Sequence, residues 1–135
     1  MFYEIGIKVT KQDEKSGNDK EVKELYLVKD VELFSEAEAK GLELYNAEND
    51  VFSIKRSPII EVINDRQYED EIFYKAKLSN VYIDEQGKEH ENNYNILLAA
   101  KSMDVAQKKV KEYMEANVLN LVFKSITETK ILEII

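Results

Sequence analysis

The sequence contains no cysteine and no tryptophan, and it has only one proline, four glycines and one histidine among 135 residues. Without cysteine there is no disulfide, no thiolate metal site and no cysteine nucleophile. So few glycines leave no glycine-rich phosphate loop and no Gly-x-Ser-x-Gly nucleophile turn. The single histidine, His90, lies in a polar segment typical of a hairpin tip and is interpreted as solvated. We therefore expect no enzyme, no metal site and no cofactor.

Long apolar runs are also missing. No run approaches the roughly 20 residues of a membrane-spanning helix, and the first ten residues lack the layout of a signal peptide. The chain has the length of one ordinary domain and can bury a core of its own. We expect a soluble cytoplasmic protein without a membrane association.

Basic residues are outnumbered by acidic ones. There are 19 lysines and arginines against 27 aspartates and glutamates, which gives a net charge of −8. Arg56 and Arg66 are the only arginines, and the lysines are spread among glutamates. Because contacts to phosphates dominate nucleic-acid affinity, this balance argues against duplex DNA as a partner.

The strongest positive signal is an internal repeat. Phe2-Tyr3 recurs as Phe73-Tyr74, and Ser53-Ile54 recurs as Ser125-Ile126. Such ordered matches at a nearly constant spacing indicate duplication. We expect two half-repeats, 1–63 and 72–135, joined by the short acidic tether 64–71.

Each half-repeat is expected to form strand, strand, helix and strand. Alternating apolar residues and turn signals predict strands at 2–10, 22–28, 51–63, 72–83, 93–99 and 121–135. Ser35 and Glu38 form a capping box for the first helix, and the second helix starts near Ser102 or Asp104. Pro58 indicates an edge or a bulge in its strand.

These elements predict one α+β domain over 1–135, with about six mostly antiparallel strands and both helices on one face. The opposite face is then partly open. Isoleucines occupy both faces of the last strand of each half, and the other half-repeat, a long loop or a second subunit is expected to cover them. The residues expected at this interface are Ile59, Ile63, Ile131 and Ile135.

Several polar and aromatic residues receive structural interpretations. Asp84-Glu85 is expected to shape a turn, and Glu69-Asp70-Glu71 to be a solvated linker rather than a calcium site. Aromatic residues on apolar strands, among them Phe73 and Phe123, are expected to be core residues rather than base-stacking surfaces.

Some segments point to a known family. They are Leu25-Tyr26-Leu27-Val28, the helix start Phe34-Ser35-Glu36-Ala37, Ser53-Ile54-Lys55-Arg56, and Tyr74-Lys75-Ala76-Lys77 followed by Asp84-Glu85. In this order they resemble the family of domain of unknown function 4494, over nearly the whole chain. The resemblance implies no activity and no catalytic residues. It implies an origin in Bacteroidota or their phages, hence a phage, prophage or mobile-element protein.

Three hypotheses for function remain. The first is a non-catalytic interaction module or phage accessory protein, binding a protein partner or forming a homodimer. The second is a small-ligand or nucleotide-binding module that uses the cleft between the repeats, with Lys55, Arg56, Lys75 and Lys77 as anion contacts. The third is single-stranded nucleic-acid binding by an open sheet face with exposed aromatic residues.

Overall fold

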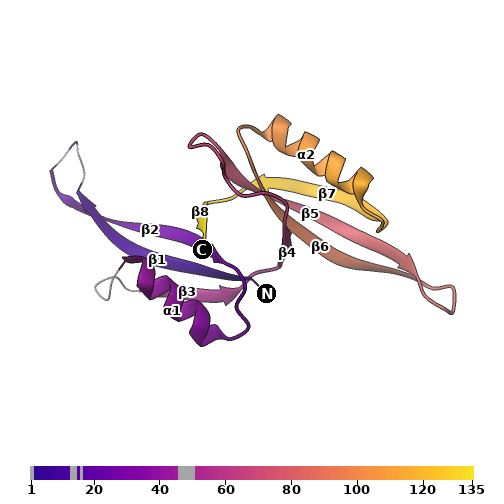
Figure 1. Ribbon diagram of the computed structural model, residues 1–135, viewed down its shortest axis with the longest axis horizontal. Helices are drawn as coiled ribbons and strands as arrows, with labels where there is room; N and C mark the ends of the chain where they lie inside the picture. Colours follow the sequence, from indigo (N-terminus) through magenta and orange to yellow (C-terminus); the bar gives the residue numbers. More distant parts are fainter. Residues whose placement is uncertain (1, 13–14, 16, 46–50) are drawn as a thin grey trace. The chain divides into compact units, whose positions relative to one another are not determined.

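The computed structural model describes residues 2–12, 15, 17–45 and 51–135 (Figure 1). This part of the chain forms eight strands and two helices, which confirms the predicted α+β class. The elements are β1 Tyr3–Gln12, β2 Asp19–Val28, α1 Phe34–Tyr45, β3 Val51–Arg56, β4 Ile59–Val62, β5 Ile72–Ile83, β6 Glu89–Ala100, α2 Met103–Ala116, β7 Leu121–Glu128 and β8 Ile131–Ile134.

The strands belong to two four-stranded sheets, with the orders β3-β1-β2-β8 and β4-β6-β5-β7. In the first sheet, β1 pairs antiparallel with β2 and β3, and β8 lies parallel to β2. In the second sheet, β5 pairs antiparallel with β6 and β7, and β4 lies parallel to β6. Each sheet is therefore a hairpin flanked by the strand that follows the helix and by a short parallel strand.

The predicted number of about six strands is wrong, because two predicted strands each divide into two. The segment 51–63 forms β3 and β4, and the segment 121–135 forms β7 and β8, with the two parts in different sheets. At the first division stands Pro58, which has no N–H to donate to a ladder, so a regular strand does not continue through it. The second division, at Thr129 and Lys130, has no comparable signal in the sequence.

The chain divides into two compact units whose bounds differ from the predicted half-repeats. Unit 1 comprises 1–57 and 130–135, and unit 2 comprises 58–129. Strand β4 follows unit 1 along the chain but belongs to unit 2, and β8 follows unit 2 but belongs to unit 1. The contiguous segment 58–129 therefore forms the second sheet, whereas β8, which follows the whole of unit 2, completes the first.

The core of unit 1 lies between its sheet and α1. Its buried cluster contains alternate residues of the hairpin together with one residue of the helix and one of the preceding loop: Tyr3, Ile5, Ile7, Tyr26, Val28, Val31 and Ala37. Helix α1 begins at Phe34, and the Leu33 carbonyl accepts hydrogen bonds from the N–H groups of Glu36 and Ala37. Ser35 therefore lies inside the first turn, and its predicted capping role is wrong.

The core of unit 2 lies between its sheet and α2, which covers one face (Figure 1). Its buried cluster joins alternate residues of β5 and β6 to two residues of the helix: Tyr74, Ala76, Leu78, Ile96, Leu98, Ala100, Ala106 and Val110. The predicted helix start is confirmed, because Ser102 is the N-cap and its hydroxyl accepts a hydrogen bond from the Val105 N–H at 3.3 Å.

The four isoleucines expected at an interface are buried or partly buried within the chain. Ile59 and Ile131 are buried. Ile63 packs against the core of unit 2 and Ile135 against the core of unit 1. Their backbones continue the parallel pairing, since the Ile63 N–H donates to Leu97 and the Ile135 N–H donates to Leu27, both at 2.8 Å. These strands complete the chain's own sheets, and a contact of the four isoleucines with another subunit stays a prediction.

Candidate functional site

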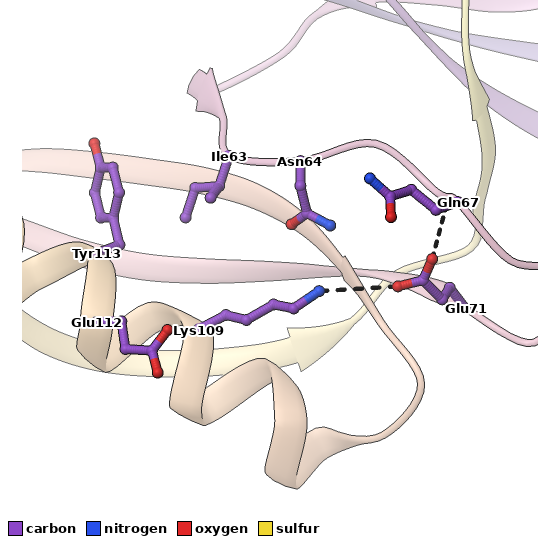
Figure 2. Close-up of a pocket in the computed structure, with 7 residues that line it drawn as sticks. All are labelled: Ile63, Asn64, Gln67, Glu71, Lys109, Glu112 and Tyr113. Carbon is purple, nitrogen blue, oxygen red and sulfur yellow. Dashed lines mark hydrogen bonds and ion pairs between the residues drawn. The ribbon is translucent and has the colours of Figure 1, made fainter.

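A pocket of about 460 Å³ lies in unit 2 between α2 and the segment before β5 (Figure 2). It is lined by Ile63, Asn64, Gln67, Glu71, Lys109, Glu112 and Tyr113. In Figure 2 the side chain of Lys109 extends from the helix toward Glu71. The segment 64–71, predicted to be a simple tether, therefore forms one wall of a pocket.

Glu71 is the central acid of this pocket. Its side chain is buried, and its carboxylate accepts hydrogen bonds from the N–H groups of Gln67 (2.7 Å) and Tyr68 (3.0 Å). The bond from Gln67 is the main cause that lowers the pKa of Glu71, while burial opposes it and the bond from Tyr68 and the charges of Lys109 and Lys101 assist. The carboxylate thus holds the loop as an anion, which corrects its interpretation as part of a solvated linker.

Lys109 and Asn64 meet at one carbonyl group. The ammonium of Lys109 donates to the Ala99 carbonyl at 2.8 Å and lies 3.8 Å from the Glu71 carboxylate. The Asn64 amide group donates to the same carbonyl at 3.0 Å and accepts from the Ala99 N–H at 3.3 Å. Asn64 therefore mimics a strand residue and extends the pairing of β6 beyond β4.

Two tyrosines and one glutamate form a second polar cluster at the edge of the pocket. The Tyr113 hydroxyl donates to the Glu61 carboxylate, and the Tyr94 hydroxyl lies 3.1 Å from that of Tyr113 and 3.3 Å from the Glu61 oxygen. Burial, followed by the hydrogen bonds to Glu61 and Tyr94, raises the pKa of Tyr113. Tyr113 therefore stays protonated at neutral pH and serves as a hydrogen-bond donor rather than a base or nucleophile.

The polar groups of the pocket mainly bind one another. Glu71 accepts from the loop, Lys109 joins the loop to β6, and Tyr113 joins α2 to Glu61 of β4. Within the described ranges, no three His, Asp or Glu side chains gather closely enough to hold a metal ion. The arrangement fixes α2, β4 and the loop relative to β6, which is a structural task.

Replacing Glu71 with glutamine should make unit 2 less stable near neutral pH. Because the pKa of Glu71 is lowered, its anion stabilises the fold at pH values above the usual pKa of 4.5. This contribution is lost as the pH falls through the lowered pKa. The difference in melting temperature between wild type and Glu71→Gln should shrink in acid. Glu69→Gln, at an exposed neighbour, is the matched control. A difference that grows in acid would contradict the assigned ionisation.

A second depression of about 420 Å³ lies between α2 and β7. It is lined by Gln107, Val110, Lys111, Met114, Glu115 and Phe123, and we call it the α2/β7 groove. Phe123 is 45% exposed, whereas the sequence predicts it to be a core residue. The prediction is wrong because β7 is the last strand of its sheet, so only one side of Phe123 has a neighbouring strand.

Further apolar side chains are exposed in β7 and in the segment that precedes it. The half-exposed or exposed members near β7 are Val118, Leu119 and Val122. In the described part of the chain, β5 is the only strand that pairs with β7, so the other edge of β7 has free backbone groups. An apolar groove next to an open strand edge is a site at which another chain can add.

The four predicted anion contacts are divided between the two units. Lys55 and Arg56 lie on β3 of unit 1, and Lys75 and Lys77 lie on β5 of unit 2. Lys55 forms an ion pair with Glu4 at 3.3 Å. Neither unit by itself brings the four side chains together, and none of them lines the pocket or the groove.

His90 takes part in the hairpin end that joins β5 to β6. Its imidazole lies 2.6 Å from the Asp84 carboxylate and stacks on the ring of Tyr82. Asp84 also accepts from the N–H groups of Gln86 and Lys88, both at 2.9 Å, and Gly87 adopts a φ of 80° that favours glycine. The predicted turn role of Asp84 is confirmed, and Asp13-Glu14, its predicted counterpart, lies outside the described residues.

The polar pocket was not predicted from the sequence. Lys109 belongs to no recognisable motif in the helix. Glu71 stands in an acidic run that is typical of solvent-exposed linkers. The signal that could have pointed to Glu71 is its place directly before a strand, where an acid can cap loop amides. Its amide partners Gln67 and Tyr68 are close in the sequence, whereas Lys109 comes from a distant segment that spacing alone does not reveal.

The fold and the two depressions define a small α+β protein with two hairpin-based sheets and an open groove beside an edge strand. The chain belongs to the family described as "Domain of unknown function (DUF4494)", which matches residues 1–135 and confirms the resemblance of the sequence. No match was found among the curated proteins. None of the described helices is both long and apolar enough to cross a membrane.

Proposed function

We propose that this chain is a non-catalytic protein-interaction module that binds an extended segment of another protein chain in the α2/β7 groove. The observation that carries the proposal is the half-exposed Phe123, which lines the groove together with Val110 and Met114 on a strand whose other edge pairs with no described strand. The occupant would carry apolar side chains at alternate positions and a low charge, to match a groove with one acid and one base on its rim.

Strand addition explains both parts of this surface. A segment that adds to β7 would satisfy backbone groups along the edge, while every second side chain would turn toward α2 and enter the groove. Phe123, at 45% exposure, would then be covered, together with Val122 on the opposite face, at 40%. Burial of such side chains contributes about 25 cal/mol per Å² of apolar surface.

The pocket supports the non-catalytic part of the proposal. Its lysine and its buried acid are hydrogen-bonded to backbone groups, and the raised pKa of Tyr113 keeps that hydroxyl protonated. General acid–base catalysis needs a group that changes its protonation near the working pH. The pocket groups are better suited to holding α2 on the sheet.

A small-ligand module is the alternative, and the pocket beside Lys109 is the observation that favours it. The Lys109 side chain is 33% exposed, but an anion would have to compete with Glu71 for its charge. Single-stranded nucleic acid has weaker support. The exposed ring of Tyr68 already contacts the ammonium of Lys101, and Tyr82 stacks on His90.

We also propose that the two units descend from one duplicated strand-strand-helix-strand segment. The matching strand pairings support this, since each hairpin is flanked by equivalent strands in its own sheet. The proposed setting, a phage or mobile-element accessory protein in the bacterial cytoplasm, depends on the family resemblance of the sequence.

Peptides selected from a random library against this protein should test the interaction surface. We expect the enriched peptides to carry apolar residues at alternate positions and to bind at least about tenfold more weakly to Phe123→Ser, because a central aromatic residue dominates such contacts. Ile83→Ser is the control, since Ile83 is 71% exposed at the far hairpin end. Calorimetry would measure both affinities. Equal binding by wild type and Phe123→Ser would refute the proposed surface.

A further inference from the structure

The rim of the α2/β7 groove is electrically balanced in a strongly acidic protein. The whole chain carries a net charge of −8, so two copies repel each other over most of their surface. The groove, in contrast, has Lys111 and Glu115 as its only charged lining residues among those described. Association of two copies is least opposed by charge at such a place.

The two charges are arranged in a self-complementary way. Lys111 and Glu115 are one helical turn apart and line the same groove. The order of lysine before glutamate is the weaker orientation for an ion pair within a helix. In the described part of the structure, neither residue forms an ion pair, so both are available to a partner.

We propose that the occupant of the α2/β7 groove is a second copy of this chain, related by a twofold axis. This inference depends on the proposed function and names the partner at that same surface. A twofold axis perpendicular to the two α2 helices makes them run antiparallel across the interface, so that Lys111 of each copy faces Glu115 of the other. Two equivalent ion pairs then flank an apolar centre.

The apolar centre is supplied by the same residues in both copies. Phe123 of one copy packs beside Phe123 of the other and covers the Met114 side chains, which line both grooves. The free edge of β7 lies next to this contact and is the segment of each copy that approaches the other. A partly polar rim around a buried aromatic centre is the usual arrangement of a protein interface.

Charge reversal provides the test. Sedimentation velocity is measured at low salt and at protein concentrations from about 1 μM to about 1 mM, which covers weak to moderate dimerisation affinities. Wild type should shift from monomer to dimer in this range. Lys111→Glu and Glu115→Lys should each raise the dissociation constant at least about tenfold, because each replaces two attractions with two repulsions. The double variant Lys111→Glu/Glu115→Lys should restore dimerisation, since it exchanges the charges in both pairs.

Lys108→Glu is the matched control, because it makes the same change of charge at an exposed residue of α2 that does not line the groove. Its dissociation constant should stay within about twofold of wild type. A wild type that remains monomeric at every concentration would overturn the inference, as would a double variant no tighter than the single ones, or a control as weak as Lys111→Glu. If the protein is monomeric but still binds selected peptides through Phe123, the dimer is refuted and the proposed function stands. If it neither dimerises nor binds peptides through Phe123, both proposals are refuted.

Discussion

Two fragments cut between Asp65 and Arg66 should not fold separately but should fold together when mixed. Fragment 1–65 contains β4 but lacks β8, which pairs with β2 in the first sheet. Fragment 66–135 contains β8 but lacks β4, which pairs with β6 in the second sheet. Each fragment would have an incomplete core at a size where single domains are only marginally stable.

Circular dichroism and two-dimensional NMR would follow this complementation. The equimolar mixture should recover the spectra and the cooperative thermal transition of the intact chain. Fragment 66–129, which lacks β8, is the control, because it should leave the amides of Leu25 and Leu27, which face β8, unprotected after mixing. Cooperative folding of each fragment alone, with no change on mixing, would contradict the exchanged arrangement of β4 and β8.

Truncation of Ile131 to alanine should destabilise the protein by about 2–4 kcal/mol, whereas Leu132→Ala should cost less than about 1 kcal/mol. Ile131 is 7% exposed and Leu132 is 43% exposed, although they are adjacent residues of the same short strand. The removed apolar volume is nearly the same, so the difference reports burial alone. Urea denaturation monitored by circular dichroism gives both free energies of unfolding.

The same comparison in β4 provides an independent check. Ile59 is 4% exposed and Ile60 is 50% exposed, so Ile59→Ala should be the more costly of the two substitutions. Equal losses at buried and exposed positions in either strand would show that β4 or β8 does not dock as the structure has it. Unchanged stability in all four variants would give the same conclusion.

Local patterns predicted most of the elements. The segment 72–83 was predicted as one strand and is β5 with both bounds, and the second helix begins at Met103, within the predicted start near Ser102 or Asp104. Ser102 was identifiable as a cap because hydrogen bonding at a helix start involves neighbouring residues only. The predicted cap at Ser35 is wrong, since α1 begins two residues earlier than such a cap requires, and the Leu33 carbonyl accepts the first hydrogen bonds of the helix.

The candidate sites were much less predictable. Phe123 has the same apolar, β-forming surroundings as Phe73, yet Phe73 is buried and Phe123 is half-exposed. The difference arises from position in the sheet, since β5 is an inner strand and β7 an edge strand. Glu71 and Lys109 are far apart in the sequence, and no spacing rule joins a loop acid to a helix base.

The sequence by itself determined the α+β class, the hairpins, the helices and the family, because short-range periodicity and capping decide these features. Only the tertiary structure decided that the segments 51–63 and 121–135 each divide into two strands. It also decided that β4 and β8 lie in other sheets than β3 and β7, which precede them, and that Ile59 and Ile131 are buried. Strand pairing depends on long-range contacts. The local sequence around an isoleucine is the same whether its side chain is buried or exposed in the folded chain. The pairing partner, not the pattern, sets what is core and what is surface.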